Sequence, residues 1–280
     1  MGWSNYHGHS NYCDGHGNLE EYVKQAIKLG IKTLGISSHA PLPFETKWAM
    51  PTEKLPDYIA DMLSLKQKYD GEIELYTGLE VDYIPDVMSP HHPSLQALTL
   101  DYTVGSVHYV DLFPDGVPFE ADGSREVFIN AIHQMFDGDE KKLVSRYFEL
   151  VQQMLKDAPP TILGHLDKIK IHNSKGQVFD EGADWYRKLV LETLDVAATS
   201  GTILEVNTRG IYKKKCSETY PSPWILKQAY ERGISITLNS DAHHIREITG
   251  AFERAAHTIK SCGYRHILQL HSGEWVEWKL

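Results

Sequence analysis

The sequence predicts an α/β fold, a distorted (β/α)7 barrel of TIM-like type with a metal site at the carboxyl ends of its strands. Strand-like apolar runs alternate with helix-like runs along the chain, which is typical of a parallel sheet with crossover helices. Histidines or acids follow seven of these runs. The length of 280 residues is normal for one barrel, so we expect a single domain over residues 1–280.

The first part of the chain alternates strands and helices in a regular way. A helix begins near Asn18, whose side chain can cap it, because apolar residues follow at helical spacing and Gly30 marks its end. A proline-rich loop over residues 41–56 leads to a second helix that ends near Tyr69. Aliphatic and β-branched runs predict strands at residues 3–9, 33–37 and 74–81.

The second part continues the alternation. Residues 125–156 are mostly helical with a break near Asp137, and no pattern describes the loop 113–125 before them. Further helices are expected at residues 184–199 and 224–231, and a last helix and an extended tail at 266–270 finish the chain. Four more strands are predicted at residues 102–108, 162–165, 203–207 and 235–239.

Metal-binding side chains lie where these seven runs end. His7 and His9 are two residues apart on a strand, so both imidazoles face one side. Asp241 and His243 repeat this spacing after the last strand, which neighbours the first strand in a closed barrel. Glu80 ends a run that should be buried, where a carboxylate needs cations or strong donors. The predicted metal ligands are His7, His9, His16, His39, Glu80, His108, His165, Asp241 and His243.

These ligand types favour a cluster of several divalent ions. Imidazole and carboxylate suit zinc, iron(II) or manganese. Cys13, Cys216 and Cys262 are too few and too scattered for a disulfide framework, and they form no competing thiolate set.

The composition limits the kinds of molecule that we expect this protein to bind. A formal net charge of −10 argues against nucleic acid, and the longest basic run, at residues 213–215, is more typical of a solvated loop. An anionic small molecule must therefore be attracted locally. No apolar run is long enough for a membrane span, and the first residues do not look like a signal peptide, so we expect a cytoplasmic location.

The motifs resemble the polymerase-and-histidinol-phosphatase (PHP) superfamily of metallophosphoesterases, and more narrowly its bacterial histidinol-phosphate phosphatases. The sequence Ala-Pro-Leu-Pro-Phe at residues 40–44 is the most specific of them. The narrower resemblance rests on residues 9–16, 38–44, 78–83, 105–109, 164–167 and 205–209.

The resemblance implies three divalent metal ions. Glu80 would be shared by the first two positions. The first position would be held by His7, His9, Glu80 and Asp241, the second by Glu80, His108 and His165, and the third by His16, His39 and His243. It also implies that Arg209 and Lys170 bind phosphate.

The implied activity is the hydrolysis of L-histidinol phosphate, a small phosphomonoester, to L-histidinol and phosphate in histidine biosynthesis. We expect a hydroxide between the first two metals to attack phosphorus, with Glu80 and Asp241 holding the metals and Arg209 binding the non-bridging oxygens. Asp14, His244 or a water on a metal could protonate the leaving group, and the sequence favours none of them.

Three alternatives stay open. One is a PHP phosphoesterase acting on another small phosphomonoester or on short oligonucleotides. Another is an amidohydrolase, which usually carries a modified lysine at a strand end, and no strand end here offers that lysine. A non-enzymatic metal-storage protein does not need an open cluster beside an arginine. The sequence indicates neither the native metals nor the oligomeric state.

Overall fold

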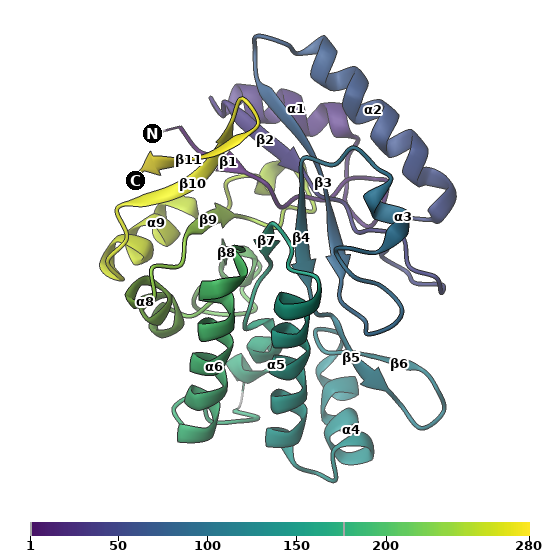
Figure 1. Ribbon diagram of the computed structural model, residues 1–280, viewed down its shortest axis with the longest axis vertical. Helices are drawn as coiled ribbons and strands as arrows, with labels where there is room; N and C mark the ends of the chain where they lie inside the picture. The colour runs from purple at the N-terminus through teal and green to yellow at the C-terminus, as the bar shows by residue number, and fades with distance from the viewer. Residues whose placement is uncertain (1, 176) are drawn as a thin grey trace.

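A parallel sheet of seven strands forms the centre of the protein, in a computed structural model that describes residues 2–175 and 177–280. Neighbouring strands in the sheet follow one another in the sequence, as a barrel requires (Figure 1). Their order is β1 (Ser4–Asn5), β2 (Thr33–Ile36), β3 (Glu74–Asp82), β4 (Tyr102–Ser106), β7 (Ile162–Leu163), β8 (Ile203–Asn207) and β9 (Ile236–Asn239). The predicted (β/α)7 barrel is confirmed.

Hydrogen bonds to two asparagine side chains link the first and last strands. Asn239 Oδ1 accepts a hydrogen bond of 2.8 Å from the backbone N–H of Tyr6, and Asn5 Oδ1 accepts one of 3.0 Å from Ser240 N–H. Beyond them the two backbones meet in a short parallel bridge between Gly8 and Ala242. The first strand is therefore shorter than the predicted residues 3–9, because side chains replace part of its ladder of backbone hydrogen bonds.

Helices surround the sheet on its outside (Figure 1). The Asn18 side chain caps α1 in a reciprocal capping box with Glu21, and Gly30 follows the helix end at a φ of 74°. The predicted break near Asp137 separates α4 from α5. The helices are α1 (Leu19–Lys28), α2 (Leu55–Lys68), α3 (Pro93–Gln96), α4 (Arg125–Met135), α5 (Glu140–Asp157), α6 (Asp184–Ser200), α7 (Arg209–Tyr212), α8 (Pro223–Glu231) and α9 (Phe252–Ser261), with 3-10 helices at Thr52–Lys54, Lys168–Lys175 and Ile245–Glu247.

Two antiparallel hairpins were not predicted. One of them pairs β5 (Tyr109–Leu112), which precedes the unassigned loop, with β6 (Pro118–Glu120), which lies inside it. β10 (His266–His271), which contains the predicted tail, pairs with β11 (Glu274–Lys279). Both depend on pairing partners that a single segment does not reveal.

The β10–β11 hairpin covers the end of the barrel where the strands begin. Trp275 packs edge-on against Tyr6, with ring centroids 5.1 Å apart, and the Tyr6 hydroxyl accepts a hydrogen bond of 2.7 Å from Leu270 N–H. The Tyr102 ring lies between Gly35 and Gly78, and its hydroxyl donates to the Tyr6 carbonyl at 2.7 Å. Aromatic packing thus closes this end and leaves the carboxyl end of the strands for a site.

Among the described residues, no helix is both long and apolar enough to cross a membrane.

We expect Gly78→Ala to destabilise the protein by about 1–3 kcal/mol, because the added methyl overpacks the barrel interior. Its Cβ would lie 2.4 Å from Cζ of the rigid Tyr102 ring. Urea unfolding at a fixed metal concentration measures the loss. Gly2→Ala is the control, since its Cβ would meet only Trp278, at an ordinary 3.6 Å. Equal stability of the two variants would contradict the packing argument.

Candidate metal centre and active site

The Glu80 carboxylate, on β3, is the centre of a cluster of histidines at the carboxyl end of the barrel. Its side chain is buried, with 1 % exposed. Five imidazoles reach it from the ends of other strands: Oε2 lies 3.0 Å from His7 Nε2, 3.3 Å from His9 Nε2 and 3.1 Å from His39 Nδ1, and Oε1 lies 3.0 Å from His165 Nε2 and 3.7 Å from His108 Nε2. Strand ends far apart in the sequence therefore converge on one carboxylate.

Asp241 and His243 complete the cluster from the segment after β9. Asp241 Oδ1 lies 3.3 Å from His9 Nε2 and 3.3 Å from His243 Nδ1. Four sets of side chains have ligand atoms within 4.8 Å of one another, close enough to hold a metal ion. They are His7, His9 and Asp241; His7, Glu80 and His165; His39, Glu80 and His108; and His9, Asp14, His39 and His243.

His16 is the one predicted ligand that the structure does not bring into the cluster. Its side chain is exposed, and its backbone pairs with His244 in a bridge. Asp14 lies in its place, with Oδ2 3.2 Å from His243 Nε2. The physical reason is the tight turn at Gly15, where a Cβ would lie 2.2 Å from the His9 carbonyl oxygen. The turn directs Asp14 inward and His16 outward.

Buried nitrogen and oxygen atoms that complete no hydrogen bond indicate that the cluster fits cations. His7 Nε2, His9 Nε2, His39 Nδ1 and Asp14 Oδ1 are inaccessible, and within the described part of the chain no group completes a hydrogen bond with them. Such groups are unfavourable in a protein interior unless a water or an ion satisfies them. Imidazole and carboxylate donors suit zinc, iron(II) or manganese, so this set can hold divalent metals.

The pKa shifts within the cluster also indicate that it can hold a cation. Burial alone would raise the pKa of Glu80, but the imidazoles of His7 and His39 hold it well below its usual value. Burial opposes protonation of His7, yet the carboxylates of Glu205 and Glu80 raise its pKa well above the usual value. A proton on His7 thus neutralises the acids around it, and a bound cation would take over this role.

Acids behind the cluster fix the orientation of two imidazoles. His7 Nδ1 lies 2.7 Å from Glu205 Oε1, and His108 Nδ1 lies 2.9 Å from Asp82 Oδ1. Each contact leaves Nε2 free to face the cluster, as outer carboxylates do for metal-binding histidines. Sequence reasoning assigned these acids no role. The available signals were a buried acid within an apolar strand for Glu205, and for Asp82 the spacing of two from Glu80, which places both on one side of β3.

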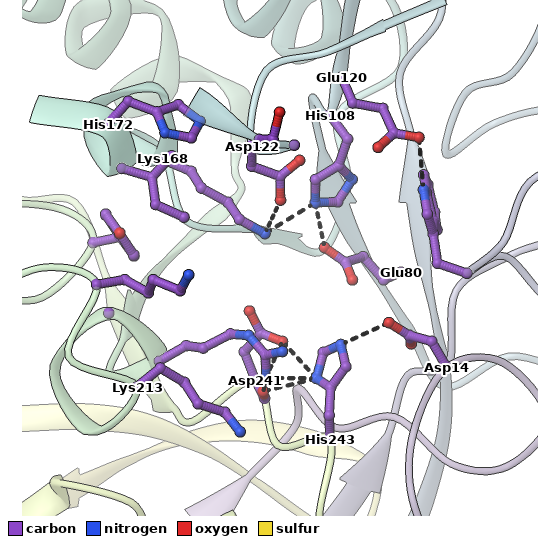
Figure 2. A pocket seen from close by; sticks show the side chains of 18 of the residues that line it. Asp14, Glu80, His108, Glu120, Asp122, Lys168, His172, Lys213, Asp241 and His243 are labelled. Atoms are coloured by element: carbon purple, nitrogen blue, oxygen red, sulfur yellow. Dashed lines mark hydrogen bonds and ion pairs between the residues drawn. The ribbon is translucent and has the colours of Figure 1, made fainter. Parts of the chain in front are cut away.

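A cavity of about 490 Å³ opens beside the cluster. Figure 2 shows Glu80 and Asp14 directed into it from one side, His172 and Lys213 on the other side, and Asp241 between them. Its charged lining residues are the acids Asp14, Glu80, Glu120, Asp122 and Asp241 and the bases Arg125, Lys168, Arg209, Lys213 and Lys215.

Arg209, predicted at the site, lies at the edge of the cluster where α7 begins. Its Nη1 donates to the Asp241 carbonyl at 2.7 Å and lies 2.7 Å from His243 Nδ1. These contacts hold the guanidinium against the metal-ligand segment while the side chain still lines the cavity.

Lys170 does not line the cavity, so the prediction that it binds phosphate is corrected. It is 2 % exposed, and its Nζ lies 2.8 Å from both Asp167 Oδ2 and Glu218 Oε1. Lys168 lines the cavity instead, with Nζ 2.9 Å from Asp122 Oδ2. Residues 168 and 170 belong to a 3-10 helix, where positions two apart point in different directions.

The rest of the cavity lining contains residues that sequence reasoning missed. Trp48 stacks on Tyr109 and donates from Nε1 to Glu120 Oε1 at 3.1 Å. His172 rests on Phe128 and lines the cavity. Residues 120 and 122–125 also line it, which explains the unassigned loop. A single segment carried no signal for residues 120–125, because the pairing of β5 with β6 brings them to the site.

Residues 5–209 match the sequence model of the family described as PHP domain. The chain belongs to the PHP domain family. It is 31% identical over 272 residues to a probable histidinol-phosphatase of Deinococcus radiodurans, covering 95% of each chain. It is 26% identical over 264 residues to the histidinol-phosphatase of Bacillus subtilis, covering 88% of this chain and 96% of the relative.

A solved structure shares the fold of this PHP domain. It is the histidinol phosphate phosphatase of Lactococcus lactis complexed with zinc, L-histidinol and phosphate, which superimposes with a TM-score of 0.76 at 20% identity over 98% of each chain. The likeness agrees with the seven-stranded barrel described above.

We expect Lys170→Met to lower the free energy of unfolding by about 3–5 kcal/mol, because it leaves the buried Asp167 carboxylate without its cation. Its effect on the binding of inorganic phosphate should be small. Lys168→Met is the matched comparison. It should weaken phosphate binding and lose less stability, since water in the cavity can hydrate Asp122. Urea unfolding and phosphate titration calorimetry measure both quantities, and the reverse pattern would restore the original assignment.

Proposed function

We propose that this PHP domain is a metal-dependent phosphomonoesterase that hydrolyses L-histidinol phosphate to L-histidinol and phosphate in histidine biosynthesis. The observation that carries the proposal is the set of five imidazoles around the buried Glu80, open to a cavity with its own cationic side chains. The similarity to named histidinol-phosphatases over nearly the whole chain supports the choice of substrate.

Three divalent ions, of zinc, iron or manganese, would be held in positions close to those expected. Asp14 replaces His16 in the third of them. We assign the first to His7, His9, Glu80 and Asp241, the second to Glu80, His108 and His165, and the third to Asp14, His39 and His243. Such ions lower the pKa of water towards neutrality and offset negative charge on phosphate.

The phosphate end of the substrate would lie between the cluster and the bases that line the cavity. Arg209 offers a planar fork of donors that can meet two phosphate oxygens, and its contacts with the Asp241 segment hold that fork in place. Lys168 adds an ammonium group from the opposite wall, taking over the role expected for Lys170. Glu80 and Asp241 contribute by holding the metals.

The organic end would lie against the acidic and aromatic wall. Histidinol carries an amine and an imidazole, both of which can be cationic. The carboxylate of Glu120 suits these groups, whereas Asp122 is already paired with Lys168. Trp48 offers a ring face to a cation or an imidazole. Trp48 Nε1 and the Tyr109 hydroxyl, both 3.1 Å from Glu120 Oε1, fix that carboxylate. The Glu120 carboxylate would also repel the next phosphate of an oligonucleotide, which disfavours the nuclease alternative.

A single domain over residues 1–280, a cytoplasmic location and the lack of a nucleic-acid partner stay predictions from the sequence.

The purified protein, loaded with manganese or zinc, should release phosphate from L-histidinol phosphate with a kcat/KM about a hundredfold above that for glycerol phosphate, because only the former pairs with the acidic wall. A chelator should abolish turnover, and added metal should restore it. Phosphate release measured with malachite green checks both results. Equal rates on all monoesters would leave the chain a PHP phosphoesterase of another substrate.

Asp14→Ala should lower the metal content by about one equivalent, because it removes one carboxylate ligand from the third position. His16→Ala, two residues away, should retain the full content, since the His16 side chain is exposed. Elemental analysis of both variants after gel filtration measures the difference. A loss of metal in His16→Ala alone would return His16 to the ligand set.

A further inference from the structure

Two cationic side chains at the cavity lack a partner in the part of the protein that the structure describes. Arg125, the first residue of α4, and Lys215, in the loop after α7, both line the cavity and are exposed. Among the residues whose side chains the structure describes, 2–173 and 177–280, neither side chain has an ion-pair or hydrogen-bond partner. The other bases of the cavity are engaged: Lys168 contacts Asp122, Lys213 contacts Glu247 and Arg209 contacts the Asp241 carbonyl.

The positions of these two cations are electrostatically unfavourable for the protein alone. Arg125 occupies the start of a helix, where the helix dipole favours acids and disfavours bases. Lys215 ends a run of three consecutive lysines that repel one another, and only Lys213 of that run has an acidic partner among the described residues. Because neither cation stabilises the fold through a described contact, a ligand is the more economical reason for their placement.

Both cations act on the same part of the cavity wall. Burial, opposed by the charge of Asp122, lowers the pKa of His172, and the charges of Arg125 and Lys215 lower it further. The two side chains therefore lie close enough to His172 to influence it, although they come from segments far apart in the sequence. Positive charge is thus concentrated at one rim of a molecule whose formal net charge is −10.

We propose that Arg125 and Lys215 form a rim subsite for the phosphate group of the incoming ester. The acidic protein repels a phosphate dianion at long range, and two unpaired cations at the entrance reverse that field locally. The substrate would meet this rim subsite first and then pass to Arg209 and the cluster. Inorganic phosphate, the product, would bind at the rim subsite as it leaves the cavity. This inference rests on the proposed phosphomonoesterase activity.

The loop itself supplies a matched control for the experiment. Lys214 lies between the two cavity lysines and is exposed, but it does not line the cavity. Arg125→Gln, Lys215→Gln, the double variant and Lys214→Gln would be compared as metal-loaded proteins, with circular dichroism and metal content checked first. Lys215→Gln and Lys214→Gln remove the same charge from the same loop, so they differ only in its position.

We expect the double variant to lose about tenfold in kcat/KM for L-histidinol phosphate at low ionic strength, with kcat changed less than about twofold. The difference from wild type should shrink at about 0.5 M salt, where the Debye length falls to a few ångströms. Calorimetric titration with inorganic phosphate should show weaker binding in Lys215→Gln than in Lys214→Gln.

Equal behaviour of Lys214→Gln and Lys215→Gln in both assays would overturn the rim subsite, because net charge alone would then explain the effect. A loss confined to kcat would also overturn it, since capture acts before the chemical step. A wild-type protein that fails to turn over L-histidinol phosphate would refute the proposed function instead, and the phosphate titration would still decide the fate of the rim subsite.

Discussion

The burial of one carboxylate constrains the rest of this structure. A buried Glu80 without compensation would be unfavourable by several kcal/mol, and five imidazoles from four strand ends lie within 3.7 Å of it. No single segment could supply them, because each strand contributes one or two side chains at its carboxyl end. The closed order of the strands is what brings opposite charges and donor atoms together there.

The two ends of the barrel have different roles: one stabilises the fold, and the other contains the candidate site. Aromatic packing of Tyr6 and Trp275 beneath the β10–β11 hairpin closes one end. At the other end, Asn239 links the closing seam to the cluster: its Oδ1 accepts from Tyr6 N–H, and its Nδ2 donates to Glu205 Oε1 at 3.0 Å. Glu205 in turn orients His7. Closure of the sheet and orientation of a ligand are therefore one connected network.

The cavity combines opposite charges in a protein that is acidic as a whole. The acids of the cluster suit metal cations, the bases that line the cavity suit phosphate, and Glu120 suits an organic cation. A zwitterionic phosphate monoester matches this division better than a polymer of phosphates does. The same division explains why overall charge is a poor guide to the ligand, since the field inside a narrow cavity depends on its nearest groups.

The sequence by itself determined the fold class, the seven strand positions to within a few residues, and every side chain of the histidine and carboxylate cluster except Asp14. Hydrophobic periodicity and the residue that follows each strand are local properties, and in a parallel barrel they fix which side chains converge. Tertiary structure decided the rest. The turn at Gly15 selected Asp14 over His16, and the 3-10 helix turned Lys168 towards the cavity and Lys170 into a buried ion pair. Side-chain direction at such irregular positions depends on backbone geometry and neighbours from distant segments, which no local pattern encodes.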